Sequence, residues 1–313
     1  MKLHWKTPLI ALAGILVLSQ NAFAASVYYG IQAGTDDGVY KVDMNTGGIT
    51  KIHSGTFTLG VTAFGADKII VTDYSQQKIS IIHTDGSIYK EFTTPVVPHF
   101  AVQDPNDLQT IIYSSHVSNQ VRLLDVDTES DTFLASYSYA NKIGVKPDGT
   151  AYIALWPPSG GGQLYNIDTN TFVASTDWIT SIISDSAGNF YFTGHPAWSY
   201  NVIYKLDTAN SLTTLYSGSY FLSGITYDEE NNRLLSFADE GGAGIALYSF
   251  TLDGTMTKLL TGLSLPHHID PFSGGYAYTL YLNAESSSAV PEPATLLLMT
   301  MSGIGLLVKR SMR

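Results

Sequence analysis

The sequence predicts an all-β fold, a six-bladed β-propeller built from four-stranded units. Three observations support this: a repeat near 42 residues, a recurrent hairpin pattern, and a composition that favours strands and turns over helices. The chain has 313 residues, including 28 Gly, 20 Tyr and 13 Phe, and no Cys. Aromatic residues favour strands and Gly favours tight turns. Without Cys, a disulfide scaffold is excluded.

An apolar-alternating strand that ends in a polar turn recurs along the body of the chain. It is written VYKVDMNTG, ISIIHTDGS, VRLLDVDTE, LYNIDTNTF, IYKLDTANS and LYSFTLDGT. The turn positions are spaced by 40, 42, 43, 39 and 44 residues. A fixed period in this range indicates a repeat architecture. The turn positions are Asp43, His83, Asp125, Asp168, Asp207 and Thr251.

A hairpin precedes each of these strands. In IGVKPDGTAYIALW, residues 143–156, a turn with Pro, Asp and Gly separates two apolar segments, which is a hairpin signature. One further strand follows the recurrent turn, as in SIYKEF. The unit is therefore four antiparallel strands, the size and order of a propeller blade.

The two ends of the body differ from this unit. Residues 27–53 read as strands of the second, third and fourth type, and residues 268–282 as strands of the first and second type. We expect the last segment to complete the first blade, because ring closure removes open sheet edges. One second-type strand, YAYTLYL, is then surplus. Seven blades, the last incomplete, therefore stay open beside six.

Both termini are predicted to be targeting segments. Residues 1–25 combine Lys2 and Lys6 with an apolar run and the exit AFAA, which predicts a secretory signal peptide. The propeller domain is expected over residues 26–284. Residues 285–313 contain a linker, fifteen mostly apolar residues, the basic end KRSMR, and a motif made of Val290, Pro291, Glu292 and Pro293.

This tail, VPEPATLLLM followed by GIGLLVKRSMR, resembles the PEP-CTERM signal of Gram-negative bacteria. The resemblance implies an exosortase-type sorting enzyme as a partner and transient membrane anchoring by the C-terminal segment. The implied location is beyond the inner membrane, at the cell envelope or outside the cell. The body resembles the NHL and YVTN propeller families, and more loosely gluconolactonase-like and streptogramin-lyase-like propellers. That resemblance implies the fold and assigns no activity.

The body is strongly acidic. Residues 26–288 carry 11 basic and 26 acidic residues, a net charge of −15. Such a charge excludes a nucleic-acid partner held by electrostatics and disfavours an acidic polysaccharide unless a cation bridges the two.

Antiparallel connectivity sorts the loops onto two faces. We call the face that carries the fourth-to-first and second-to-third strand connections the front face. The first-to-second and third-to-fourth turns lie on the opposite face, which we call the back face. The repeated Asp residues fall on the back face and are expected to form Asx turns. The irregular residues fall on the front face and predict a ligand site there, with the candidates His99, His116, Trp156, His195, Trp198, Asp239 and His268.

A divalent cation is a second possibility for the front face. Asp73 and Asp239 are the candidate ligands, because calcium prefers carboxylate oxygens. The gluconolactonase-like ligand positions, however, read Asp73, Ser115, Trp156, Gly194 and Asp239, and most of these cannot bind a metal. No cofactor and no catalytic residue are assigned, since no G-x-S-x-G, H-E-x-x-H or P-loop motif is present.

We therefore expect an exported, monomeric, non-enzymatic propeller. It would be a binding or scaffold module at the cell envelope or in the extracellular polysaccharide matrix, with a polysaccharide or an envelope protein as its partner. The alternative is a hydrolase or lyase, lactonase-like or streptogramin-lyase-like, with a divalent cation at the channel mouth.

Overall fold

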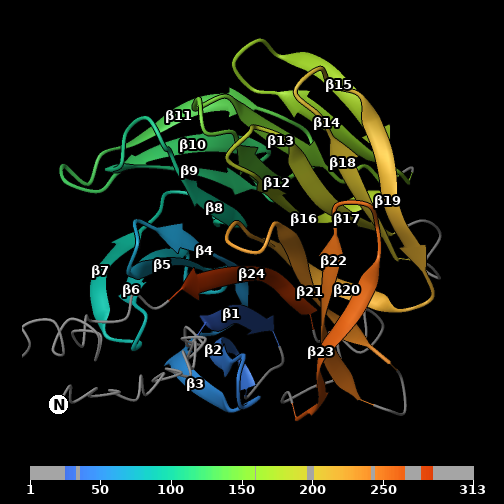
Figure 1. Cartoon of the computed structure of the whole chain (residues 1–313). Helices are drawn as coiled ribbons and strands as arrows, with labels where there is room; N and C mark the ends of the chain where they lie inside the picture. Colours follow the sequence, from blue (N-terminus) through green and yellow to red (C-terminus); the bar gives the residue numbers. More distant parts are fainter. Residues whose placement is uncertain are drawn as a thin grey trace, which may run out of the picture. The chain divides into compact units, whose positions relative to one another are not determined.

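The protein is built from six four-stranded antiparallel sheets (Figure 1). The computed structural model describes residues 25–32, 36–158, 160–195, 201–240, 244–264 and 276–284. Every element whose bounds lie within these residues is a β-strand. The all-β prediction and the six blades are thereby confirmed. Among the described residues, no helix has the length and apolar character needed to span a membrane. The predicted sorting motif lies outside the described residues, as does the predicted signal peptide up to position 24.

Each blade is one sheet, and its strands are given from first to fourth. Blade 1 contains β24 (Tyr276–Ala284), β1 (Ala25–Gln32), β2 (Gly38–Asp43) and β3 (Ile49–Ser54). Blade 2 contains β4 (Thr58–Phe64), β5 (Lys68–Asp73), β6 (Lys78–His83) and β7 (Ile88–Thr93). Blade 3 contains β8 (Phe100–Gln103), β9 (Thr110–Ser115), β10 (Gln120–Asp125) and β11 (Asp131–Ser136).

The second half of the ring repeats this plan. Blade 4 contains β12 (Ala140–Val145), β13 (Ala151–Leu155), β14 (Gly162–Asn166) and β15 (Thr171–Thr176). Blade 5 contains β16 (Trp178–Ser184), β17 (Phe190–His195), β18 (Asn201–Leu206) and β19 (Leu212–Gly218). Blade 6 contains β20 (Phe221–Asp228), β21 (Arg233–Asp239), β22 (Ile245–Thr251) and β23 (Met256–Leu263).

The first strands of the six blades form the inner ring, and β24 closes it. Each first strand contacts the first strand of the next blade, and β24 contacts both β20 and β4. It pairs along β1 from Ala25 opposite Ala284 to Gln32 opposite Tyr276. The predicted closure is confirmed. The interpretation of YAYTLYL as a surplus second-type strand is wrong, because this segment is itself the first strand of blade 1.

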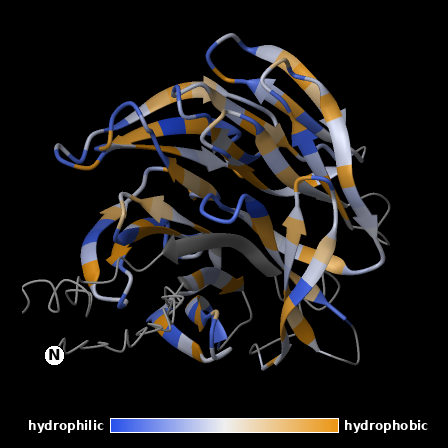
Figure 2. Cartoon of the chain, viewed as in Figure 1, coloured by the Kyte–Doolittle hydropathy of each residue, from blue (hydrophilic) through white to orange (hydrophobic). Residues whose placement is uncertain are grey.

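Six apolar clusters hold the ring together, and each joins two neighbouring blades. On β9, Ile111 and Tyr113 pack with residues of blade 2, whereas Ile112 between them packs with residues of blade 4. Both faces of a sheet are therefore buried, which explains why its second strand reads as a nearly continuous apolar run. Figure 2 shows apolar residues recurring along the strands of the blades.

Hydroxyl side chains add polar links between inner strands. The Thr62 hydroxyl of β4 donates to the carbonyl of Ala101 on β8 at 2.7 Å. The Ser184 hydroxyl of β16 donates to the carbonyl of Val145 on β12 at 2.7 Å. A first strand has no sheet neighbour on its channel side, so such bonds satisfy backbone groups that the sheet leaves open.

The back-face turns follow the predicted Asx geometry, with one correction. Asp43 Oδ1 accepts the amide hydrogens of Asn45 and Thr46 at 2.8 and 2.9 Å. In blade 4 the turn residue is Asn166, whose Oδ1 accepts the Thr169 amide at 3.0 Å. The prediction for Asp168 was wrong, because its carboxylate instead accepts the amide of Ala151 at 3.4 Å.

The closure by β24 yields a stability prediction. A chain that ends after Gly275 lacks β24, so β1 loses its partner and the inner sides of blades 2 and 6 lose a neighbour. We expect this chain to aggregate or to lose the cooperative unfolding transition. A matched chain that ends after Ser288 keeps β24 and is expected to unfold as the full chain does. Circular dichroism melting and size-exclusion chromatography measure both outcomes; equal melting temperatures for the two truncations would contradict the closure.

Candidate ligand-binding face

Aromatic and imidazole rings pair repeatedly on the front face. The pairs lie at the start of consecutive first strands, and each joins a residue there to one in a second-to-third connection. The ring centroids are 5.0 Å apart for Phe57 and Tyr74, and 5.8 Å apart for His99 and His116. Tyr139 lies 6.0 Å from His116. The structure therefore brings together two of the predicted histidines, and adds Tyr139 to them.

Two of these ring residues have strained backbones. Phe57 has φ 81° and Tyr139 has φ 64°, a region that costs a bulky residue about 1–3 kcal/mol. Each precedes a first strand, and each amide donates to a side chain. The Phe57 amide donates to Asp37 Oδ2 at 2.6 Å, and the Tyr139 amide donates to Asn119 Oδ1 at 2.8 Å. These bonds hold the two rings in place against the strain.

His99 is a neutral, buried group. The residue is 9% exposed, and its amide donates to the Ser114 carbonyl at 2.7 Å. Burial, followed by the nearby charges of Lys142 and His116, holds the pKa of His99 well below its ordinary value. The ring therefore stays uncharged at neutral pH.

Lys142 is a residue of β12, and it lies close to His99. Its side chain is fully buried, and Nζ lies 4.8 Å from the centre of the Phe100 ring. Burial lowers the pKa of Lys142 to about 7. Sequence reasoning missed this residue, because a lysine in a strand is ordinarily exposed.

Trp156 is engaged by the protein itself. Its indole Nε1 donates to the carbonyl of Ile179 at 2.6 Å, across the boundary between blades 4 and 5. The ring stacks on Trp178, with centroids 6.1 Å apart and an interplanar angle of 23°. These are the contacts of an inter-blade packing residue, so its predicted role in ligand binding stays a prediction.

Asp73 is likewise saturated by local donors. The carboxylate accepts the Thr56 amide at 2.8 Å, the Thr56 hydroxyl at 3.2 Å and the Gln76 amide at 2.9 Å. Asp239 ends β21 opposite Phe221. In the part of the chain that the structure describes, no three His, Cys, Asp or Glu side chains are grouped so that they could hold a metal ion.

The remaining candidates are placed only in part. His195 ends β17, and its backbone lies opposite Trp178. Trp198 and His268 lie outside the described residues. Whether these three residues join the front-face cluster therefore stays a prediction.

The inner strands contain bulges that no sequence pattern indicates. The register shifts between Thr58 and Gly60 in blade 2, and between Ala140 and Lys142 in blade 4. A third shift lies in β16 of blade 5. A bulge inserts one unpaired residue and redirects its side chain, and bulges are frequent next to binding sites.

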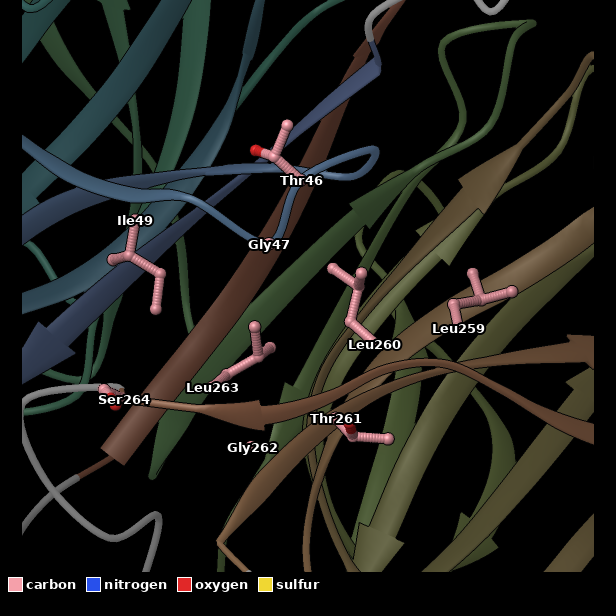
Figure 3. Close-up of a pocket in the computed structure, with 9 residues that line it drawn as sticks. All are labelled: Thr46, Gly47, Ile49, Leu259, Leu260, Thr261, Gly262, Leu263 and Ser264. Carbon is pink, nitrogen blue, oxygen red and sulfur yellow. The ribbon is translucent and has the colours of Figure 1, made fainter.

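A separate groove lies at the seam between blades 1 and 6 (Figure 3). Its volume is about 510 Å³, and its walls come from the β2–β3 turn and from β23. The side chains of Leu260 and Leu263 lie close to Gly47. The lining residues are Thr46, Gly47, Ile49, Leu259, Leu260, Thr261, Gly262, Leu263 and Ser264.

Comparison with known proteins supports the fold alone. No protein-family model matches the chain, and no curated protein matches it. Among solved structures, a chain of a nidogen/laminin complex matches with a TM-score of 0.62 and 11% identity, covering 83% of this chain and 98% of that one.

Two further solved structures match less closely. The β-propeller domain of Cps50 (Swd1) from Myceliophteria thermophila has a TM-score of 0.53 and 10% identity over 77% of this chain and 88% of its own. A putative 6-phosphogluconolactonase from Bacteroides uniformis has a TM-score of 0.51 and 12% identity over 83% of this chain and 85% of its own. Identities this low show a shared fold and carry no function.

The state of Lys142 predicts a pH dependence of stability. Between pH 7 and the ordinary lysine range, the unfolded chain holds a proton that the folded chain lacks, so the free energy of unfolding rises with pH. One proton contributes at most about 1.4 kcal/mol per pH unit. Lys142→Met is expected to remove this slope in urea unfolding between pH 7 and 9, while Lys146→Met keeps it. An unchanged slope in Lys142→Met would contradict the prediction.

The bonds of Asp73 predict a structural role. In Asp73→Asn, one oxygen becomes an amide that cannot accept the Thr56 or Gln76 hydrogens. We expect the free energy of unfolding, measured with urea, to fall by about 1–3 kcal/mol. This decrease should be the same in the presence of calcium and in the presence of EDTA. Asp239→Asn is the comparison variant. If calcium stabilises the wild type and this gain disappears in both variants, Asp73 and Asp239 are cation ligands instead.

Proposed function

We propose that this protein is an exported, non-enzymatic propeller that acts as a binding or scaffold module. Its place is the cell envelope or the extracellular polysaccharide matrix, where a polysaccharide or an envelope protein is its partner. The observation that supports a binding role is the series of ring pairs on the front face, which includes two strained aromatic residues. Strained backbones cluster at active sites and ligand clamps, where the surrounding structure holds them.

The proposed location depends on the two terminal segments. Residues 1–25 have the pattern of a signal peptide, and Val290 to Pro293 begin a tail that resembles the PEP-CTERM signal. An exosortase-type enzyme would process this tail. The net charge of −15 over residues 26–288 favours solubility outside the cytoplasm.

A propeller hydrolase or lyase is the second candidate. A neutral imidazole is the form that a general base needs, and the state of His99 meets that condition. The putative 6-phosphogluconolactonase among the structural neighbours is compatible with this alternative. The saturated carboxylate of Asp73 favours the binding module, because a lactonase-like cation site would need free carboxylate oxygens.

Cell fractionation with a polysaccharide pull-down tests the proposal. We expect the wild-type chain in the envelope or medium, retained on the isolated extracellular polysaccharide of the host. Replacing Pro291, Glu292 and Pro293 with Ala should leave the protein in the inner-membrane fraction, whereas replacing Ser286, Ser287 and Ser288 with Ala should not. A cytoplasmic wild-type protein, or an exported one that binds neither polysaccharide nor envelope protein, would overturn the proposal.

A further inference from the structure

The boundary between blades 3 and 4 contains buried polar atoms that have no hydrogen-bond partner in the structure. They are Nδ1 of His99, Nδ1 of His116 and Oδ1 of Asn141. Asn141 is 1% exposed. A buried polar atom without a partner costs about 1–3 kcal/mol, and most buried polar groups are satisfied. Three such atoms at one boundary call for a functional explanation.

These three side chains belong to one contact network at the front face. The His99 ring contacts the His116 ring, and the His116 ring contacts Tyr139. The backbone of Asn141 interacts with the His99 ring. The network leads from the surface inward: Tyr139 is 39% exposed, His116 is half-buried, and His99 and Asn141 are buried.

Asn141 occupies the bulge of β12. The register shifts between Ala140 and Lys142, so Asn141 is the extra residue. The corresponding residue of the next blade is Thr180, and its hydroxyl is paired with that of Thr193 at 2.8 Å. Blade 4 therefore differs from blade 5, because its bulge residue has an acceptor that the protein leaves unsatisfied.

The chemistry of the network favours a neutral hydroxylated ligand. A neutral imidazole nitrogen can donate or accept, depending on its tautomer, and an amide oxygen accepts. A hydroxyl group does both, so it satisfies either kind of atom. The Tyr139 ring adds an exposed apolar face of the kind that packs against sugar rings. A cation is disfavoured, because the network contains no carboxylate, and no three His, Cys, Asp or Glu side chains of the described residues are grouped to hold a metal ion.

We propose that His99, His116, Asn141 and Tyr139 form a binding subsite for a neutral saccharide. Its hydroxyl groups would pair with the three unsatisfied atoms, and one sugar face would pack against Tyr139. This inference rests on the binding function proposed above and assigns the sugar-stacking role to Tyr139, since Trp156 is stacked on Trp178.

Two substitutions separate binding from folding. Asn141→Leu replaces an unsatisfied amide with an apolar side chain of similar size, so the melting temperature should stay equal or rise. Tyr139→Gly removes the ring and relieves the strained φ. Both should lower saccharide affinity about tenfold or more, which corresponds to about 1.4 kcal/mol. Asn210→Gly removes a side chain at a comparable positive φ of 61° in the back-face turn between β18 and β19, and it should leave the affinity unchanged.

A further pair covers the case in which these variants fail to fold. His116→Phe keeps a ring between His99 and Tyr139 and removes the polar atom, so it should also lose binding. The matched variant is His83→Phe, because His83 contacts Tyr89 with ring centroids 5.8 Å apart on the back face. That variant should bind as the wild type does.

The measurement is isothermal titration of the full chain with glucose, galactose, mannose and xylose, and with glucuronic acid as the acidic probe. Binding of a neutral sugar that is lost in Asn141→Leu, Tyr139→Gly and His116→Phe and kept in both controls supports the subsite. The inference is overturned if no neutral sugar binds, if only glucuronic acid binds, or if these variants bind normally. If the protein is nevertheless retained on host polysaccharide, the proposed binding function still holds, because a different surface of the protein then binds the polysaccharide.

Discussion

The structure depends on the burial of both faces of every sheet. Each blade therefore needs another blade on both sides, because a missing neighbour would leave one apolar face of its sheet exposed to solvent. Each of the six apolar clusters is shared by two blades, so no blade has a core of its own. A closed ring is the arrangement that satisfies all of them, and β24 is the strand through which the chain achieves it.

Ring closure also determines where recognition can occur. The first strands all begin on the front face, so residues that precede them gather there although they are far apart in sequence. Phe57, His99 and Tyr139 each lie just before a first strand, and each contacts a ring from a second-to-third connection. The regular part of the repeat supplies the framework, and these irregular positions supply the differences between blades. The unsatisfied atoms at the boundary of blades 3 and 4 are one such difference.

The period and the turn residues were sufficient to predict four-stranded blades and the sorting of their loops onto two faces, because these follow from local alternation and turn chemistry. They left six and seven blades both open. Features that depend on the neighbouring blade were not predictable. The stacking of Trp156 on Trp178 and the burial of Lys142 are set by side chains from other strands. The bulge at Asn141 leaves no pattern in the sequence. YAYTLYL was misassigned because first and second strands share the same apolar alternation, and only pairing with β1 distinguishes them.

The pairing of Ala25 with Ala284 has a mechanical consequence. Tension applied to Ala284 along the axis of β24 loads the hydrogen bonds to β1 in shear, so that many must break together. The same strand pulled away from Ala25 would open one bond at a time from that end. The ring therefore resists a pull along the axis of β24 better than a pull that peels this strand away from Ala25.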